Sequence, residues 1–294
     1  MRCGGEIRQL TVISGKGGTG KTTLAAAFAS LARGAVLADC DVDAPDLHLL
    51  LRPEILSMEE FKGTRLAEID PAKCTGCGAC RERCRFLAID EKFRIIAERC
   101  EGCGVCGIVC LAGAIRYVER VLGSAFISRT RFGPMAHAEL EPGGEASGKL
   151  VSLVLQSARE LAKREGRGLI IVDGPPGTGC PVIASLGGAS LALLVTEPTP
   201  SGIHDLERVL EVCEHFNVPA MVCINKHDLN EGNTKSIERW CSERGLELAG
   251  KLPYSDAPSR AMVAEKTVVE LEPEGFGRLV DGIWRRVARR ILSG

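Results

Sequence analysis

A glycine-rich segment near the start of the chain combines two lysines with threonines. It reads GKGGTGKT over 15–22 and ends in Lys21 and Thr22. Glycines let backbone N–H groups curl around phosphate oxygens, the lysine reaches the β- and γ-phosphates, and the threonine hydroxyl ligates Mg²⁺. The segment therefore predicts a P-loop for a nucleoside triphosphate, with contacts from Gly15, Lys16, Gly17, Gly18, Thr19, Gly20, Lys21, Thr22 and Thr23.

Aspartates follow two further apolar segments of strand length. Asp39 and Asp41 lie in ADCDVDAPD, and Asp173 ends the segment LIIVD. An aspartate at the carboxyl end of a strand beside the P-loop strand is suited to hold Mg²⁺, so we expect Asp39, Asp173 and the Thr22 hydroxyl around the metal. One aspartate after the second strand is suited to orient the attacking water. For Asp43 and Asp46, capping of a helix is the simpler interpretation.

The segment 225–228 reads NKHD and bears on the choice of base. The pattern NKxD reads guanine in GTPases, where the carboxylate accepts from the N1–H and N2–H₂ donors of the base. Asp228 occupies that position here. From the residues alone, a guanine contact and a cap of the following loop both remain open for Asp228.

Eight of the 14 cysteines form a repeated pattern in the middle of the chain. The first run has the spacing C-x₂-C-x₂-C-x₃-C, and the second repeats it 26 residues later. This is the spacing of two-cluster ferredoxins, in which the fourth cysteine of each run ligates the other cluster. We predict two [4Fe–4S] clusters, one on Cys74, Cys77, Cys80 and Cys110 and the other on Cys84, Cys100, Cys103 and Cys106.

Zinc and disulfides are the alternatives for these thiols. The usual proline after the fourth cysteine is absent, because Arg85 and Leu111 occupy the two positions. The proline is not a ligand, so its loss leaves the ligand prediction unchanged. It is expected to alter solvent access and the reduction potential.

Apolar runs of strand length alternate with helical segments around these motifs. Strands are expected at 7–14, 35–39, 169–173, 191–196 and 220–225, and helices at 21–33, 150–164, 202–216 and 235–244. Continuous apolar strands alternating with helices predict a parallel sheet covered on both faces. The fold class is therefore α/β, a mostly parallel, doubly wound sheet.

The character of the sequence changes where the eight cysteines occur. We expect a small α+β domain of bacterial ferredoxin type inserted over 64–118, with its first motif in 65–93 and its second in 91–118. The nucleotide-binding domain then comprises 1–63 and 119–294. Residues 119–149 carry no clear pattern and are expected to return the chain to the sheet.

The composition of the 294 residues is that of a globular protein, with 45% hydrophobic and 26% charged residues. The net charge of −1 gives no reason to expect nucleic acid as a partner. The first ten residues lack the apolar core of a signal peptide, and no run is suited to span a membrane, so we expect a cytoplasmic protein. In that reducing compartment, many cysteines indicate metal or redox chemistry before disulfides.

The motifs together resemble the MinD/ParA superfamily of P-loop ATPases. A second lysine, Lys16, lies inside the P-loop, and DCD near position 40, DGPPGTGCP from 173 and TEPTPSG from 196 are similar to that superfamily. The resemblance implies a homodimer that sandwiches nucleotide, with Lys16 crossing to the partner's phosphates. It also implies that Asp41 orients the water and that the loops after Asp39 and Asp173 sense the nucleotide.

The resemblance favours ATP over GTP. It implies that the Asn225 side chain and the backbone near Pro253 contact adenine. Taken whole, the chain resembles members that carry an inserted ferredoxin domain. The function expected is an ATPase that couples dimer opening and closing to electron transfer to a partner protein. The alternatives are a metallocofactor carrier or assembly factor, as in the related Mrp-type ATPases, and a spatial organiser tuned by redox state.

Two further features have competing interpretations. Cys180 begins an expected helix, and the nitrogenase iron protein, a distant relative, ligates a cluster from a similar position. A packing role is the alternative for Cys180. The segment 276–292 predicts a basic amphipathic helix, and we expect core packing rather than membrane contact. Cys3, Cys40, Cys213, Cys223 and Cys241 are expected to be core or surface thiols.

Overall fold

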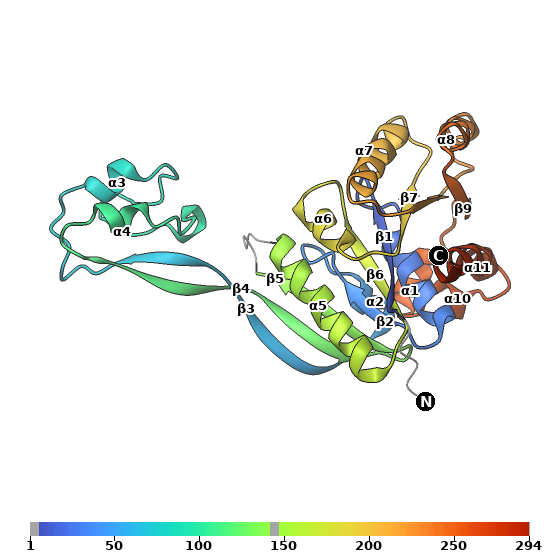
Figure 1. The fold of residues 1–294 in the computed structure, drawn as a ribbon, viewed down its shortest axis with the longest axis horizontal. Helices are drawn as coiled ribbons and strands as arrows, with labels where there is room; N and C mark the ends of the chain where they lie inside the picture. Colours follow the sequence, from blue (N-terminus) through green and yellow to red (C-terminus); the bar gives the residue numbers. More distant parts are fainter. Residues whose placement is uncertain (1–5, 142–146, 294) are drawn as a thin grey trace. The chain divides into compact units, whose positions relative to one another are not determined.

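The computed structural model describes residues 6–141 and 147–293. Within them a nine-stranded sheet has the order β3-β4-β5-β2-β6-β1-β7-β8-β9 (Figure 1). Its central strands are β1 (Arg8–Ser14), β2 (Val36–Asp39), β6 (Leu169–Pro176), β7 (Leu191–Thr196), β8 (Ala220–Ile224) and β9 (Glu247–Lys251). The pairs β1–β6, β1–β7, β2–β6, β7–β8 and β8–β9 are all parallel, which confirms the predicted sheet.

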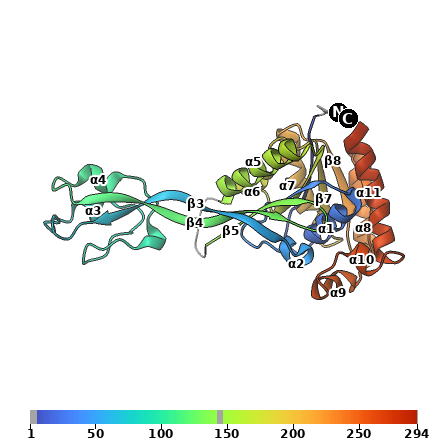
Figure 2. The same ribbon diagram turned by 90° about the horizontal axis from the view of Figure 1, so that it is seen from below.

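Helices cover both faces of the central strands (Figure 2). One face packs against α1 (Lys21–Ala32), α2 (Leu47–Leu51), α9 (Ala257–Val263), α10 (Val268–Leu271) and α11 (Phe276–Ser293). The other packs against α6 (Cys180–Leu186), α7 (Gly202–His215) and α8 (Glu231–Glu243), while α5 (Ser147–Glu165) contacts α6, β2 and β6. Side chains alternate between the faces as strand geometry requires, with Val12 in one core cluster and Ile13 in the other.

The last helix, α11, belongs to the core. Its residues Phe276, Val280, Ile283, Val287 and Ile291 are buried. The predicted core packing of this helix is therefore confirmed, although Leu279 of the same helix is 46% exposed. Among the described residues, no helix has the length and apolar character needed to cross a bilayer.

Three further strands flank the cysteine-rich segment, and two of them are long. β3 (Glu54–Ile69), β4 (Ile115–Arg129) and β5 (Pro134–Leu140) form one side of the sheet order. The chain divides into two compact units, and the divisions at 59/60 and 124/125 fall inside β3 and β4. The first unit, called here the nucleotide unit, comprises 6–59, 125–139 and 147–293 of the described residues. The second, called the cysteine unit, comprises 60–124 with 140–141.

The cysteine unit is built from short elements. They are α3 (Ala79–Arg83), α4 (Val105–Val109) and the 3₁₀ turn η1 (Ala97–Arg99), together with the ends of β3 and β4. An isolated antiparallel bridge joins Ile89 to Ile95. Cys80 lies in α3 and Cys106 in α4, and the other six cysteines of the repeated pattern lie in the loops around these elements.

Candidate functional site

The P-loop lies between β1, which ends at Ser14, and α1, which begins at Lys21. Gly20 precedes the helix with φ 95°, a left-handed conformation that favours glycine. Asn225 Nδ2 donates to the Thr19 carbonyl at 2.8 Å, and a Cβ at Gly20 would lie only 2.6 Å from that nitrogen. Since Gly20 offers no side chain to cap the helix, the first N–H groups of α1 remain suited to an anion.

Two buried aspartates lie side by side at the carboxyl edge of the sheet. Asp39 and Asp173 are partners in the parallel register of β2 and β6, with 0% and 1% of their surfaces exposed. Asp39 accepts from the N–H groups of Asp41 at 3.2 Å and Leu47 at 3.3 Å. Burial, together with the charge of Asp173, raises the pKa of Asp39 well above its usual range.

Asp173 has different partners. Neither of its buried carboxylate oxygens has a hydrogen-bond partner among the described residues. Burial raises the pKa of Asp173 to about 7, an effect that the neighbouring Thr22 hydroxyl and Lys21 ammonium partly offset. A buried, ionised carboxylate is unfavourable unless a cation compensates it. Carboxylates with a threonine hydroxyl are the hard oxygen ligands that Mg²⁺ prefers, so these residues fit the metal.

A cleft opens beside these groups. It brings together most of the predicted nucleotide contacts: Gly17, Gly18, Gly20, Lys21, Thr22, Thr23, Asp41 and Asn225. Burial raises the pKa of Asp41, partly offset by the charge of Lys21. Asp43 and Asp46 also line the cleft. The capping prediction is wrong for Asp46, because it precedes α2 without a side-chain bond while the Asp39 carboxylate accepts from the first amide of that helix.

The other predicted base contacts lie at the margin of this cleft. Within the described residues, neither Asp228 nor Pro253 lines it, although Leu252 and Tyr254 do. Asp228 Oδ1 accepts from the Tyr254 N–H at 2.6 Å. The carboxylate thus joins the loop after β8 to the loop after β9.

Lys16 turns toward a glutamate and a threonine of its own chain. Its Nζ lies 3.2 Å from Thr199 Oγ1 and 3.8 Å from Glu197 Oε2. Lys226 Nζ lies 2.5 Å from the other oxygen of Glu197, whose side chain is only 12% exposed. Both residues belong to the segment TEPTPSG, but its pattern predicted no role for Glu197 or Thr199. The signal that could have indicated a role for Glu197 is its position directly after the apolar strand expected at 191–196.

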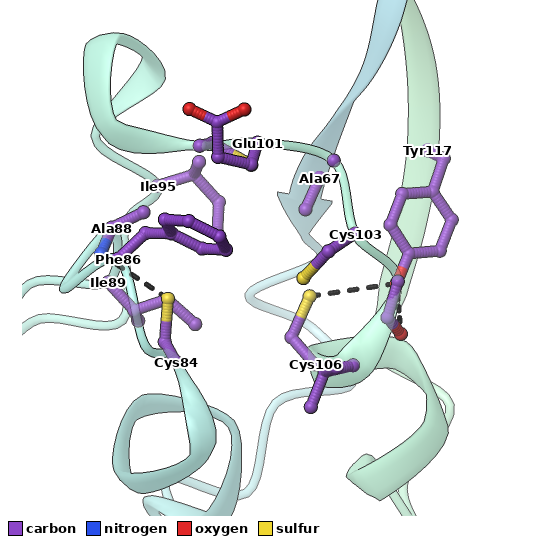
Figure 3. A pocket seen from close by; sticks show the side chains of 14 residues that line it. Ala67, Cys84, Phe86, Ala88, Ile89, Ile95, Glu101, Cys103, Cys106 and Tyr117 are labelled. Atoms are coloured by element: carbon purple, nitrogen blue, oxygen red, sulfur yellow. Dashed lines mark hydrogen bonds between the residues drawn. The ribbon is translucent and has the colours of Figure 1, made fainter.

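The eight cysteines surround two cavities in the cysteine unit. One is lined by Cys74, Cys77, Cys80 and Cys110, together with Phe93. The other is lined by Cys84, Cys100, Cys103 and Cys106, with Phe86 and Tyr117 beside them (Figure 3). Each cavity thus collects one of the two quartets that the spacing predicts. Among the described residues, no three histidine, cysteine or acidic side chains converge on a position for one metal ion.

The two runs of cysteines have matching local geometry. The N–H of Ala88 donates to Cys84 Sγ at 3.4 Å, and the N–H of Ala114, 26 residues on, donates to Cys110 Sγ at 3.3 Å. The paired glycines of the two loops also match, with φ 70° and 83° at Gly76 and Gly78 and 60° and 85° at Gly102 and Gly104. The sequence duplication is therefore a structural duplication.

Comparison with known proteins identifies the nucleotide-binding machinery. Residues 10–268 match the CobQ/CobB/MinD/ParA nucleotide binding domain. The chain belongs to this family. It is therefore a P-loop ATPase, as the sequence analysis predicted.

Two relatives match different shares of the chain. The uncharacterized protein MJ0578 of Methanocaldococcus jannaschii is 36% identical over 232 residues, which is 78% of this chain and 82% of that protein. The septum site-determining protein MinD of Bacillus subtilis is 26% identical over 129 residues, 42% of this chain and 47% of that one.

Solved structures share the fold. Pyrococcus horikoshii MinD complexed with Mg-ADP has a TM-score of 0.61 at 18% identity and covers 98% of both chains. The Aquifex aeolicus MinC:MinD complex has a MinD chain with a TM-score of 0.56 at 18% identity, covering 96% of this chain and 95% of that one. The family's α/β architecture is thus confirmed.

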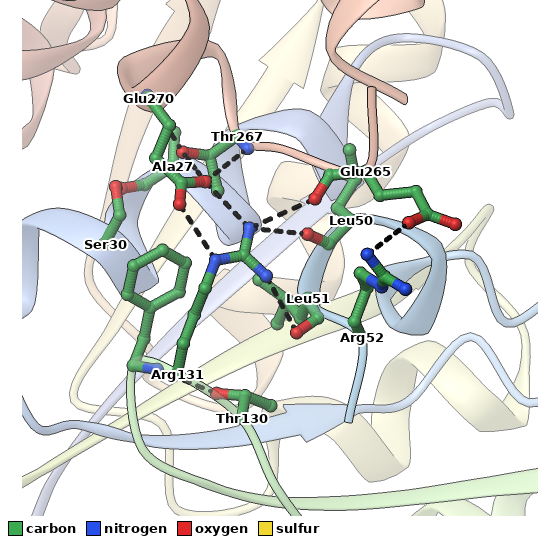
Figure 4. Close-up of polar contacts among 11 residues, drawn as sticks. Ala27, Ser30, Leu50, Leu51, Arg52, Thr130, Arg131, Glu265, Thr267 and Glu270 are labelled. Atoms are coloured by element: carbon green, nitrogen blue, oxygen red, sulfur yellow. Dashed lines mark hydrogen bonds and ion pairs between the residues drawn. The ribbon is translucent and has the colours of Figure 1, made fainter. Parts of the chain in front are cut away.

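A partly exposed network around Arg131 holds α2, the helix that follows Asp39 and Asp41. Arg131, in the turn between β4 and β5, donates to the carbonyls of Leu50 and Leu51 at the end of α2, both at 2.9 Å. It also pairs with Glu270 at 2.7 Å (Figure 4). Arginine at a helix carboxyl end satisfies carbonyls that have no partner in the helix. Nothing in the sequence pattern around Arg131 indicated this role.

The remaining cysteines lie in the nucleotide unit, apart from Cys3, which is outside the described residues. Cys180 begins α6 as expected and is exposed. Cys40, Cys213, Cys223 and Cys241 are buried. Burial raises the thiol pKa to about 12 for Cys213 and Cys223 and to about 11 for Cys241, so these three are unreactive core thiols.

Proposed function

We propose that this ATPase carries two [4Fe–4S] clusters and couples nucleotide-driven opening and closing of a homodimer to electron transfer to a partner protein. The observation that carries the proposal is the gathering of the eight cysteines around two cavities, four at each. The fourth cysteine of each run lines the cavity of the other run, as shared ligation in two-cluster ferredoxins requires.

The cavities suit clusters better than single ions. In a [4Fe–4S] cluster each thiolate binds a different iron, so the four sulfurs surround a volume, whereas tetrahedral zinc draws them around one atom. Backbone N–H groups already point at Cys84 and Cys110, and hydrogen bonds to sulfur stabilise a negatively charged cluster. When bound, such clusters supply one-electron transfer.

In the nucleotide unit we assign phosphate binding to the P-loop and to Lys21. Thr22 and Asp173 hold Mg²⁺, and Asp39 supports the site from the neighbouring strand. Asp41 lines the same cleft and is assigned to orient the water that attacks the γ-phosphate in line. Asp41 is half-buried, and the charge of Lys21 partly offsets the effect of that burial on its pKa.

Lys16 is assigned to the partner's phosphates in the dimer. In the single protomer Glu197 and Thr199 hold its side chain, and only 37% of that side chain is exposed. Dimer closure over nucleotide then requires Lys16 to exchange these contacts for phosphate oxygens. Glu197 keeps Lys226 as a partner when Lys16 leaves.

For the base we propose adenine, contacted by Asn225 and by the backbone near Pro253. The Asp228 carboxylate is already engaged with the Tyr254 N–H, which removes it from a guanine-reading role. Asn225 lines the cleft while its amide binds the P-loop at Thr19, so one side chain joins base and phosphate regions.

The first test is iron and sulfide analysis of the protein isolated without oxygen, where about eight irons per chain are expected for two clusters. The second is redox titration with MgADP and with a non-hydrolysable MgATP analogue. A nucleotide-dependent shift near 59 mV corresponds to tenfold coupling of a one-electron couple. By linkage, reduction must then change nucleotide affinity by the same factor. Protein without iron overturns the proposal.

The alternatives give different outcomes in the same preparation. A cluster carrier transfers iron to an apo-acceptor protein, whereas resident clusters keep their full iron content after that incubation. A spatial organiser binds vesicles or DNA in an ATP-dependent manner during co-sedimentation. The clusters have only a structural role if three results coincide. The iron stays bound, the protein does not sediment with vesicles or DNA when ATP is present, and nucleotide does not shift the reduction potential.

A further inference from the structure

Tyr117 introduces a difference between the two cavities. It lies on β4, and its hydroxyl oxygen is 3.6 Å from Cys106 Sγ (Figure 3). The Gly107 N–H donates to that oxygen at 3.0 Å, and the hydroxyl lies 3.0 Å from the Gly104 carbonyl. A Cβ at Gly107 would overlap the hydroxyl, so a glycine here leaves room for the phenol.

The duplication supplies an internal comparison. The residue that lies 26 positions before Tyr117 is Glu91, an exposed side chain paired with Arg81 at 3.3 Å. The aromatic ring that lines the other cavity belongs to Phe93, which has no hydroxyl. Among the described residues, the cavity of Cys74, Cys77, Cys80 and Cys110 is therefore lined by a phenyl ring but by no phenol, whereas the other cavity has a phenol against a cysteine sulfur.

The chemistry of the phenol decides what it does beside a cluster. The hydroxyl has one proton, and the Gly107 N–H occupies a lone pair of its oxygen. That proton can go to the Gly104 carbonyl or to Cys106 Sγ. A thiolate bound to iron has no proton and carries negative charge, so it can only accept, and charge-assisted hydrogen bonds are the stronger ones.

We propose that Tyr117 is a positioning residue that donates to Cys106 Sγ and raises the reduction potential of the cluster on Cys84, Cys100, Cys103 and Cys106 above that of the other cluster. A donor at the sulfur stabilises the reduced cluster, which has one more negative charge. An electron that enters the chain then resides on this cluster in preference to the other. The inference rests on the proposed function, because it requires both clusters.

The test is Tyr117→Phe, with anaerobic redox titration followed by electron paramagnetic resonance. We expect full iron content, a fall of about 59 mV for one cluster, equivalent to a tenfold change, and no change for the other. Tyr254→Phe is the matched control, because the chain has two tyrosines and Tyr254 lies in the nucleotide unit. Since Tyr254 lines the nucleotide cleft, all proteins are titrated without nucleotide. This control should leave both potentials unchanged.

A second substitution keeps the hydroxyl. Global replacement of the two tyrosines by 3-fluorotyrosine makes the phenol a stronger donor and should raise the same potential. If Tyr117→Phe loses iron, this protein still decides the question. Unchanged potentials in either protein, with clusters present, overturn the role of Tyr117 and leave the proposed function intact. Iron-free wild-type protein overturns the proposed function instead.

Discussion

The nucleotide unit and the cysteine unit form their sites in different ways. In the nucleotide unit, two extended clusters of buried side chains flank a parallel sheet, and the site lies at the carboxyl edge of its strands. In the cysteine unit, the buried side chains within 60–124 are Ala67, Cys80, Ala88, Ile89, Ala114 and Leu122. The nucleotide unit thus has a packed apolar core beside its site, whereas the cysteine unit has few buried side chains and two cavities lined by cysteines.

The difference concerns what stabilises each unit. A sheet with packed helices positions Lys21 and Asp173 before any ligand arrives. A segment of this size with few buried apolar groups generally needs metal, disulfides or a partner to hold its fold. We therefore expect the geometry of the cysteine unit to depend on its clusters, and that of the nucleotide unit to be independent of them.

The largest expected effect is a loss of ATP turnover that leaves the cysteine unit unchanged. Lys21→Ala removes the buried ammonium that stabilises charge on the phosphates, and ATP turnover should fall by more than about 100-fold. Steady-state phosphate release measures this loss, with iron analysis on the same sample. Iron content should stay at the wild-type level, and a loss of iron would contradict the independence of the units.

The duplicated glycines offer a matched pair within the cysteine unit. Gly102 and Gly76 both have positive φ, but a Cβ at Gly102 would overlap the Arg65 carbonyl whereas one at Gly76 would lie 3.6 Å from Phe93. Gly102→Ala should cost more than about 3 kcal/mol and release iron, while Gly76→Ala should cost about 1 to 2 kcal/mol from backbone strain alone. Cluster absorbance during thermal unfolding measures both. Equal losses of stability in the two variants would show that the Arg65 carbonyl moves away and relieves the overlap at Gly102.

A buried histidine makes the nucleotide unit sensitive to acid. His137 Nε2 lies 2.8 Å from Ser128 Oγ, and the imidazole ring stacks on Phe126. Burial lowers the pKa of His137 to about 4. Because the unfolded chain protonates near 6.5, stability is lost as the pH falls from about 6.5 to 4, by about 2 kcal/mol at pH 5. His137→Gln removes this part of the pH dependence.

Denaturant unfolding at pH 7.5 and pH 5 checks the histidine prediction. Both tryptophans, Trp240 and Trp284, lie in the nucleotide unit, so their fluorescence reports this unit alone. The wild-type protein should lose about 2 kcal/mol more than His137→Gln between the two pH values. An identical pH dependence in the two proteins would show that His137 titrates normally.

The smallest expected effect is a gain in stability. Leu87 is 70% exposed and has φ 51°, while its counterpart 26 residues on is Gly113 with φ 60°. Leucine in the left-handed region costs the folded state about 1 to 2 kcal/mol, and replacement by glycine removes this cost. The greater freedom of glycine in the unfolded chain offsets about half of the resulting gain in stability. Leu87→Gly should therefore stabilise the cysteine unit by about 0.5 to 1 kcal/mol. Gly113→Leu, the reverse change, should destabilise it, and thermal unfolding followed by cluster absorbance measures both variants.

Much of the fold could be predicted from local sequence. Apolar runs such as 169–173 predicted the parallel strands, because a strand covered on both faces must be apolar at every position. The amphipathic pattern of 276–292 predicted a helix packed on the core. The long strands β3 and β4 escaped prediction, since much of their surface is polar and exposed and no apolar alternation marks them.

The sequence by itself determined which groups do chemistry, because the types and spacing of Lys21, Thr22 and the cysteines carry that information locally. Only the tertiary structure decided their environment. Burial leaves the Asp173 carboxylate without a hydrogen-bond partner among the described residues. Folding also brings Lys16 to Glu197 and places the phenol of Tyr117 beside Cys106. Charge, proton affinity and hydrogen bonding depend on such neighbours, and neighbours are fixed by packing rather than by spacing along the chain.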